Sequence, residues 1–386
     1  MAYIVLARKK RPVSFDSVIG QRHITETLKK AIEKNRVAHA YIFSGTRGVG
    51  KTSTARILAR AMNCEQGPTP EPCGVCGSCR DIASGVSINV QEIDGASNNS
   101  VNDIRELRSN IRYSSMDGGY RIYVIDEVHM LTREAFNALL KTLEEPPEKV
   151  IFIFATTEPS KIPDTIVSRT QRYDFRRVSD ELIFSHLVEV CDQEGMEYDS
   201  SAVKVVAAKA DGSVRDSLSL LDQIRSFCGD EKITEEAVRS VLGLISRDTF
   251  SRLMKSFNDS APGEAVSLLR EVLKRGYDLD DFIGGFQEYL RGILTESVTE
   301  SEGAGESDFS VVDILRMSEM VRETEYRLKH TNFPVFLVET LLIRLAYMDE
   351  AVTISSLMQG IDSDSGDAAV KKDTGDTAVK KKVKRG

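Results

Sequence analysis

Short apolar runs alternate with longer amphipathic segments through the first half of the chain. The runs are rich in β-branched and aromatic residues, and the segments between them repeat apolar positions at helical spacing. This alternation predicts an α/β domain with a parallel sheet. The expected strands are residues 40–44, 89–94, 121–127, 150–155 and 173–175. The expected helices are residues 21–35, 53–62 and 132–145, with another from about residue 100.

From residue 179 the pattern becomes helical throughout. Residues 179–243 predict a small lid domain, with helices at residues 179–191, 202–209, 214–227 and 235–242. Residues 244–355 predict about five more amphipathic helices, broken by a polar linker at 299–308. This bundle contains no catalytic constellation, so we interpret it as an oligomerisation domain. Residues 356–386 are of low complexity and predict a disordered charged tail. The expected order is therefore the α/β domain (residues 1–178), the lid, the bundle and the tail.

The composition is that of an ordinary globular protein, with 41% hydrophobic and 28% charged residues. No apolar run reaches the length of about eighteen residues that a membrane span needs, and the apolar N-terminus is too short for a secretory signal. We therefore expect a cytoplasmic protein that does not enter the membrane. In such a protein, the six cysteines favour metal binding over disulfides.

Residues 45–52 form a complete phosphate loop of the pattern G-x-x-x-x-G-K-[ST], between an expected strand and an expected helix. Its glycines let backbone N–H groups turn toward polyphosphate oxygens, which the positive end of the helix also attracts. Lys51 is expected to reach the β- and γ-phosphates of ATP, and Thr52 to bind Mg²⁺. The predicted nucleotide-binding residues of the loop are Gly45, Thr46, Arg47, Gly48, Val49, Gly50, Lys51 and Thr52.

Polar residues end two further strands. Asp126 and Glu127 follow the apolar run at 121–125, where Asp126 is expected to hold Mg²⁺ and Glu127 to polarise the attacking water. Thr157 follows the run at 150–155 and is placed to hydrogen-bond the γ-phosphate or the attacking water. Together with the phosphate loop, these residues predict ATP hydrolysis rather than nucleotide binding alone.

Two arginines are candidates for sensing or completing the site. Arg169 lies at the far edge of the first domain, where it can reach the nucleotide of a neighbouring subunit and speed hydrolysis by about a thousandfold or more. Arg215 opens the third lid helix and is placed to lean onto the γ-phosphate. The alternative for Arg215 is a surface arginine paired with Asp211 or Asp216.

Four cysteines follow the phosphate-loop helix in Gly- and Pro-rich sequence, with the spacing C-x8-C-x2-C-x2-C. Four thiolates suit a tetrahedral zinc site that leaves no position open for substrate, so the site is expected to be structural. The alternative is a loop of four free thiols, which would oxidise and have nothing to order them. The predicted zinc ligands, in a zinc module at about 64–79, are Cys64, Cys73, Cys76 and Cys79.

Basic residues gather in the first domain, which has 26 Lys and Arg against 20 Asp and Glu, whereas the remainder has 25 against 39. This asymmetry suits a face for nucleic acid and equally a face for an acidic protein. Residues 8–11 are all basic and suggest a contact on the adenine side of the nucleotide. Arg105, Arg108 and Arg112 share one face of an expected helix and are candidates for phosphate contacts with DNA.

The sequence resembles the tau/gamma subunits of the bacterial DNA polymerase III clamp loader, which are AAA+ ATPases. The likeness runs from about residue 3 to residue 350. Its most specific parts are HAYIFSGTRGVGKT at 39–52, the four-cysteine insert, IDEVHML at 125–131 and LLKTLEEPP at 139–147.

The resemblance implies a RecA-like AAA+ domain with a parallel sheet and a zinc insert, then a helical lid and an all-α collar. It implies an ATPase, without a polymerase active site, that works with further copies of itself and with delta and delta-prime subunits at cytoplasmic replication forks. Together they would open the sliding clamp and load it on primer-template DNA during chromosome replication. Accessory subunits linked to the single-stranded-DNA-binding protein are a further implied partner.

The resemblance also assigns roles to residues: Thr157 is the first sensor, Arg169 the finger in trans and Arg215 the second sensor. The family usually reads Ser-Arg-Cys where this sequence has Ser168, Arg169 and Thr170. Since the arginine is retained, we expect the finger to work.

Two other functions share part of the pattern. A different AAA+ ring motor on DNA, of the branch-migration helicase type, would share the ATPase core but lack the zinc insert and the collar. A non-hydrolysing clamp-loader stator would need neither Lys51 nor the acidic pair at 126–127. The presence of all these features favours the motor subunit of a clamp loader.

Overall fold

The computed structural model of the protein describes residues 4–111, 118–299 and 309–348. The chain folds into two compact units, Met1–Leu242 and Gly243–Gly386. Arg112, the polar linker beyond Thr299 and the charged tail, all singled out in the sequence, lie outside the described residues.

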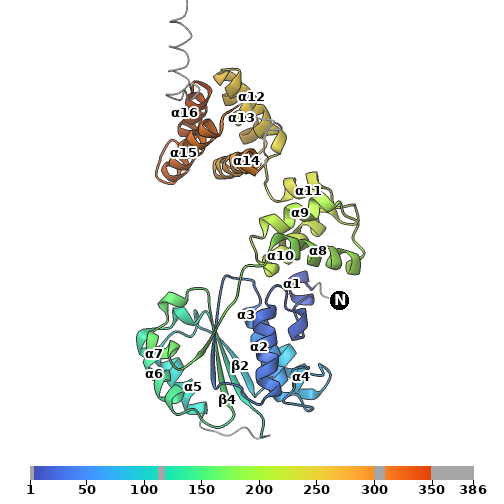
Figure 1. Ribbon diagram of the computed structural model, residues 1–386, viewed down its shortest axis with the longest axis vertical. Helices are drawn as coiled ribbons and strands as arrows, with labels where there is room; N and C mark the ends of the chain where they lie inside the picture. Colours follow the sequence, from blue (N-terminus) through green and yellow to red (C-terminus); the bar gives the residue numbers. More distant parts are fainter. Residues whose placement is uncertain (1–3, 112–117, 300–308, 349–386) are drawn as a thin grey trace, which may run out of the picture. The chain divides into compact units, whose positions relative to one another are not determined.

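Five parallel strands form the central sheet of the first unit, in the order β2-β3-β4-β1-β5 (Figure 1). The strands are β1 (Ala40–Ser44), β2 (Val90–Asp94), β3 (Arg121–Asp126), β4 (Val150–Thr156) and β5 (Gln171–Asp174). Every predicted strand is confirmed, and no bound differs by more than about two residues. The register places Ser44 beside Thr156, so the carboxyl ends of the two central strands meet at one edge, where ligands bind in such sheets.

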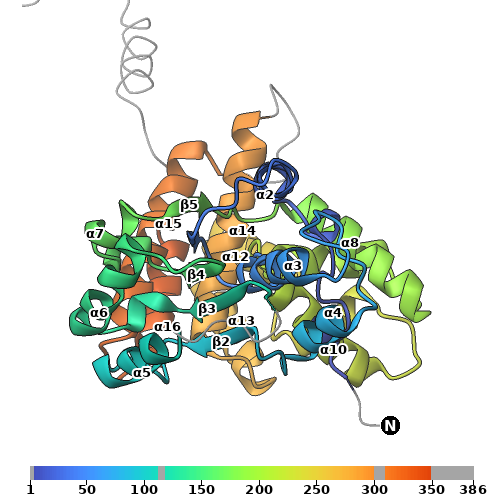
Figure 2. The ribbon, with the colours of Figure 1, turned by 90° about the horizontal axis from the view of Figure 1, so that it is seen from below.

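Each face of the sheet has its own layer of helices, because successive side chains of a strand point to opposite faces (Figures 1 and 2). Tyr41 and Phe43 pack into the core under one layer, and Ile42 packs into the core under the other. The first layer is α2 (Arg22–Glu33) and α3 (Lys51–Asn63), and the second is α5 (Val101–Ile111), α6 (Arg133–Glu144) and α7 (Asp164–Val167). The predicted α/β architecture is therefore confirmed.

One of the helices that the sequence prediction omits lies in the cysteine segment of the first unit. α4 (Gly77–Ser84) begins inside this segment, where the sequence shows no helical periodicity and we predict no helix. The Cys76 sulfur caps the helix by accepting a hydrogen bond from the Cys79 N–H, and Gly85 ends it in a left-handed conformation. With only Cys79 and Ile82 buried, α4 is too short to give a periodic signal.

The lid helices form a core of their own within the first unit. They are α8 (Asp180–Glu194), α9 (Ser200–Lys209), α10 (Val214–Cys228) and α11 (Glu235–Val241). The N-terminal helix α1 (Leu6–Lys9) joins this core through Leu6, which is fully buried there. The sequence assigns these N-terminal residues to the first domain, but the apolar neighbours of Leu6 belong to the lid. Short 3-10 turns complete the unit: η1 (Phe15–Ser17), η2 (Val128–Met130) and η3 (Pro159–Lys161).

In the described residues of the second unit, all the regular elements are helices. Its helices are α12 (Arg247–Asn258), α13 (Pro262–Lys274), α14 (Leu279–Thr299), α15 (Val311–Leu328) and α16 (Pro334–Ala346). The N-cap side chains of Ser246 and Ser310 accept backbone hydrogen bonds and begin α12 and α15. Phe250, Phe282 and Phe286 are buried at the centre of the bundle, which therefore has a core independent of the sheet.

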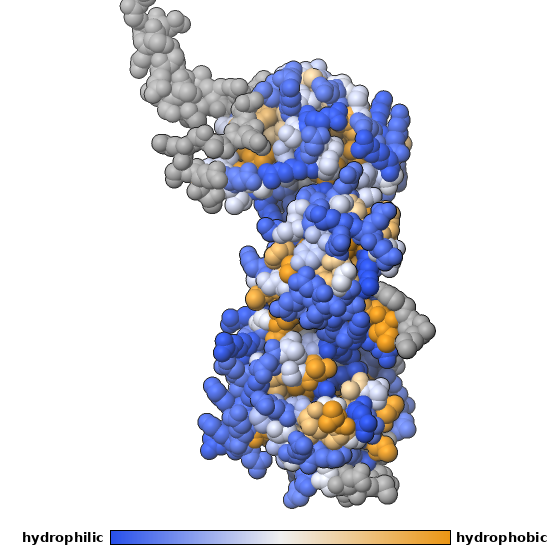
Figure 3. Space-filling model, turned by 90° about the vertical axis from the view of Figure 1, so that its right-hand side faces the viewer, coloured by the Kyte–Doolittle hydropathy of each residue, from blue (hydrophilic) through white to orange (hydrophobic). Residues whose placement is uncertain are grey.

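The surface of the protein is mostly polar on the face drawn in Figure 3, with smaller apolar groups among the polar ones. Scattered apolar side chains of this kind are normal on folded proteins. Among the helices described, none combines the length and the apolar character needed to cross a bilayer.

Candidate nucleotide and metal sites

The phosphate loop lies at the carboxyl edge of the sheet, between the end of β1 and the start of α3. Gly50 precedes α3 in a left-handed conformation, and Gly48 also has a positive φ of 77°. A Cβ on Gly48 would overlap the Ser213 hydroxyl from the lid. Glycine is therefore required at 48 both for the turn and for the close approach of the lid.

Lys51 is buried and folds back over the loop. Its Nζ donates hydrogen bonds to the carbonyl oxygens of Gly45 and Thr46, at 2.7 and 2.8 Å. Burial lowers the pKa of Lys51, while the nearby carboxylates of Glu127 and Asp126 raise it. The ammonium group thus sits among polar partners that phosphate oxygens can replace.

The acidic pair after β3 lies directly beside the loop. The Thr52 hydroxyl donates to Asp126 Oδ2 at 2.8 Å, so two oxygens that suit Mg²⁺ are neighbours. The Thr157 hydroxyl, after β4, donates to Glu127 Oε2 at 3.1 Å. The structure therefore brings together Lys51, Thr52 and the polar ends of β3 and β4, as the sequence predicts for a nucleotide site.

Arg215 comes to the same loop from the lid. Its backbone N–H donates to the Gly48 carbonyl oxygen at 3.3 Å, and Ser213 caps α10 beside it. Asp211 pairs with Arg177 instead of Arg215, and within the described residues the Arg215 guanidinium forms no ion pair. The local pairing considered for Arg215 is thus not seen, and its exposed side chain remains next to the loop.

Arg169 is separate from this cluster. It follows α7, and its guanidinium binds Glu144 at 2.9 Å and the Thr165 carbonyl oxygen at 2.9 Å. Glu144 is the last residue of α6, on the face of the sheet opposite α3. The structure brings Arg169 to no residue of its own phosphate loop, and its action on a neighbouring subunit stays a prediction.

The basic run at 8–11 divides between two elements. Lys9 and Lys10 bind Glu194 in the lid, at 2.7 and 2.9 Å. Arg11 instead donates to the hydroxyl of Ser53, in the first turn of α3, at 3.3 Å. Burial, and then the charge of Arg56, lower the pKa of Arg11. Arg11 is thus a neighbour of the nucleotide site that the sequence indicates only as part of a charged run.

The arginine face predicted on α5 is described in part. Arg105 is exposed, whereas the side chain of Arg108 and all of Arg112 lie outside the described part of the chain. Contact between this face and DNA therefore stays a prediction.

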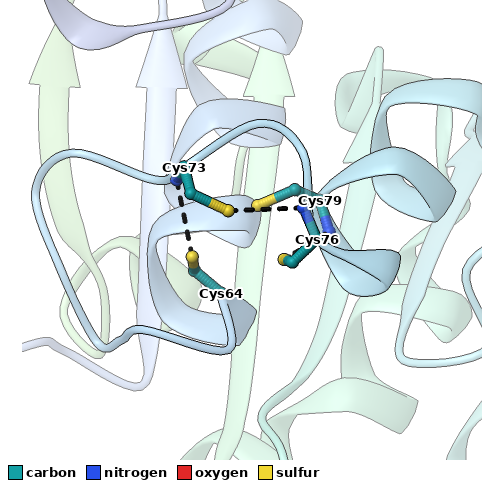
Figure 4. A group of neighbouring side chains, drawn as sticks. All are labelled: Cys64, Cys73, Cys76 and Cys79. Carbon is teal, nitrogen blue, oxygen red and sulfur yellow. Dashed lines mark hydrogen bonds between the residues drawn. The ribbon is translucent and has the colours of Figure 1, made fainter.

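The four predicted zinc ligands form one cluster, in which all sulfur atoms lie within 4.8 Å of one another (Figure 4). The N–H groups of Cys73, Cys76 and Cys79 donate to the preceding cysteine sulfurs at 3.4–3.5 Å. Burial raises the pKa of the Cys79 thiol to about 12, so a thiolate there needs a compensating cation. Four converging sulfurs with N–H donors to three of them fit a tetrahedral zinc ion.

His129 is a buried side chain at the site that the sequence does not single out as functional. It lies in η2 beside Glu127, and its imidazole also reaches Thr156 and Glu158. Nothing in the sequence pattern distinguishes it from an ordinary buried histidine, because its contacts with Thr156 and Glu158 join it to a different strand.

A parallel sheet with a phosphate loop after β1, an acidic pair after β3, a polar residue after β4 and a helical lid that returns to the loop define an AAA+ ATPase. Three family models match the chain in succession. They describe the DNA polymerase III delta subunit at residues 20–179, the ATPase lid domain of the DNA polymerase III clamp loader subunit at 182–230, and domain III of the gamma and tau subunits at 233–361.

Curated relatives agree with these models. The chain is 40% identical to DNA polymerase III subunit tau of Bacillus subtilis over 89% of its length and 63% of the relative, and 41% identical to that of Escherichia coli over 83% and 50%. It is 39% identical to subunit gamma of Buchnera aphidicola over 76% of its length and 81% of the relative. The chain belongs to the tau/gamma subunit family of the DNA polymerase III clamp loader.

The chain spans about half to two thirds of the length of the tau subunits it matches. Among solved structures, the RuvB Holliday junction branch migration motor of Thermotoga maritima is similar at 19% identity and a TM-score of 0.47, over 73% of this chain and 91% of that one.

Proposed function

We propose that this chain is an ATP-hydrolysing motor subunit of a clamp loader, which opens a sliding clamp and loads it on primed DNA. The observation that carries the proposal is the cluster of Lys51, Thr52, Asp126 and Glu127 at one edge of the sheet, in a chain of the tau/gamma family. A stator that only holds partners together would need none of these four side chains.

In this proposal the loop N–H groups of residues 45–52 bind the phosphates of ATP. Lys51 exchanges its two carbonyl partners for β- and γ-phosphate oxygens, which are stronger acceptors because they are charged. Thr52 and Asp126 hold Mg²⁺, which neutralises the charge that develops on the phosphates. Glu127 orients and polarises the attacking water. Thr157, which follows β4, helps to position the same water.

Two arginines couple this site to its surroundings. Arg215 contacts the γ-phosphate from the lid, so the lid angle reports which nucleotide is bound. Arg169 leaves its ion pair with Glu144 and enters the active site of a neighbouring subunit, where its charge stabilises the transferring phosphoryl group. Each active site is then complete only at the boundary between two subunits.

The remaining parts support this motor. The four cysteines hold a structural zinc ion that orders the insert between α3 and α4. Residues 179–243 act as the lid, and the helical bundle at 244–355 acts as the collar that holds the subunits together. The partners we propose are further copies of this chain, delta and delta-prime subunits, the clamp, primer-template DNA and accessory subunits linked to the single-stranded-DNA-binding protein. Polymerisation itself is assigned to other subunits of the holoenzyme.

The experiment that tests the function compares wild type with Lys51→Ala in a reconstituted loading reaction. We expect ATP hydrolysis that rises with clamp and primed DNA in wild type, and a loss of at least about a hundredfold in the variant, because Lys51 contacts the transferred phosphate. The yield of clamp on DNA should follow hydrolysis. Equal clamp loading with and without ATP would contradict the proposal, and strand separation without a clamp would favour a branch-migration motor.

A further inference from the structure

The side chain of His129 occupies a position between the ends of β3 and β4. It belongs to η2, which follows Glu127 directly, and only 7% of the side chain is exposed. Glu127 itself has a left-handed backbone, with φ of 45°, so the chain turns sharply there. Val128 is fully buried and anchors the turn. The imidazole is thereby fixed beside the carboxylate that the proposed function uses as a base.

The two nitrogens of the ring face different groups. Nδ1 lies 3.1 Å from the Thr156 hydroxyl and 3.4 Å from Glu127 Oε2. Nε2 lies 3.3 Å from Glu158 Oε1, and Glu158 is held in turn by Lys161 at 2.9 Å. His129 therefore connects the end of β3 to the end of β4 and to η3.

Glu127 is held through one oxygen only. Oε2 accepts from the Thr157 hydroxyl and faces Nδ1 of His129, whereas Oε1 has no hydrogen-bond partner among the described residues. With Oε2 fixed on two sides, Oε1 is the oxygen left to accept a proton from water. A general base works only when its lone pair is held in the right place, so fixing one oxygen orients the other.

We infer that His129 is a positioning residue for ATP hydrolysis, and that the contact of its Nδ1 with Glu127 Oε2 orients the carboxylate. This inference rests on the proposed function, since it concerns the same Glu127. The Nε2 side, facing the partly exposed Glu158, fixes the ring but does not touch the base. The two sides of the ring are thus expected to differ in their effect on catalysis.

Three substitutions separate the two sides of the ring. In His129→Asn the side-chain amide can place an N–H donor at the position of Nδ1, and in His129→Gln it can place one near the position of Nε2. His129→Phe retains an aromatic ring but has no hydrogen-bond donor. We expect kcat to fall about tenfold or more in the Phe and Gln variants and to recover to within about threefold of wild type in the Asn variant. The KM for ATP should stay constant, because Lys51 and Thr52 still bind the nucleotide.

Glu158→Gln is the matched control, since Glu158 contacts only the Nε2 side, and its kcat should equal that of wild type. Melting temperature and binding of a fluorescent ATP analogue are measured for every variant, so that a loss of fold is not taken for a loss of positioning. A wild-type kcat in His129→Phe, equal losses in the Asn and Gln variants, or a loss that appears in KM would overturn the inference. Absence of hydrolysis in the wild type would instead count against the proposed function.

Discussion

At the scale of single residues, Cys79 shows how a side chain can serve the fold without touching the chemistry. Its thiol is fully buried in the four-sulfur cluster, which contains none of the residues proposed for catalysis. We predict that Cys79→Ser loses bound zinc and about 2 kcal/mol or more of unfolding free energy, because metal binding contributes directly to folding. Its kcat per folded molecule should not change.

Elemental analysis, denaturant melts and ATP turnover check this prediction. Cys228→Ser is the control, because Cys228 is a lid cysteine outside the cluster and should leave the zinc content unchanged. A Cys79→Ser protein with normal melting but without ATPase activity would show that the cluster acts in the chemical step, contrary to our assignment.

The sequence predicts some site residues and misses others for a physical reason. Lys51 and Thr52 belong to a contiguous loop whose backbone shape requires glycines at fixed positions, so the pattern itself reveals them. Arg11 becomes a neighbour of the site only when it folds onto α3, and His129 reaches the end of β4 only when the ends of β3 and β4 meet. A single buried histidine or a surface arginine has no spacing that indicates such contacts.

At the scale of elements, periodicity gives the sheet and its helical layers because each strand and helix buries one side or one stripe. It fails at α4, which is capped by a cysteine sulfur, and at α1, which is four residues long. The place of α1 in the lid depends on the fit of Leu6 into a core built from residues far along the chain. Local sequence contains no information on that fit.

The contact between α1 and the lid also involves a buried charge. Glu194, at the end of α8, accepts a hydrogen bond from Lys9 and is bound by Lys10 and Arg225, with only 8% of its side chain exposed. The hydrogen bond from Lys9, followed by that from Lys10, lowers the pKa of Glu194 to about 2. The ionised form is thus much more stable in the folded state than in the unfolded state.

We predict that Glu194→Gln lowers the free energy of unfolding by about 1–3 kcal/mol at about pH 7. Because the folded pKa is lowered from 4.5, the contribution of Glu194 is complete above pH 4.5 and is lost as the pH falls toward about 2. The difference between variant and wild type should therefore shrink on acidification. Denaturant melts at several pH values measure it, with exposed Glu189→Gln as the control. A difference that grows in acid would contradict the assignment.

At the scale of the whole molecule, the proposed role of Arg169 depends on more than one copy of the chain. Its guanidinium binds Glu144 on the side of the sheet opposite α3 and contacts no residue of its own phosphate loop. We predict that Arg169→Ala binds ATP normally. Its rate of hydrolysis should fall by about a thousandfold, because the active site of the neighbouring subunit then lacks the positive charge of Arg169. Arg172→Ala is the control, since Arg172 is a nearby exposed arginine paired with Asp174.

Mixing two inactive proteins tests whether the arginine acts between subunits. Arg169→Ala subunits keep an intact phosphate loop, and Lys51→Ala subunits keep an intact finger, so neither protein alone should hydrolyse ATP. In a mixed assembly, a Lys51→Ala subunit can offer Arg169 to the site of an Arg169→Ala neighbour, and turnover should return in part. If the mixture stays inactive while the subunits exchange, Arg169 does not act in trans, and the motor must complete each active site within one chain.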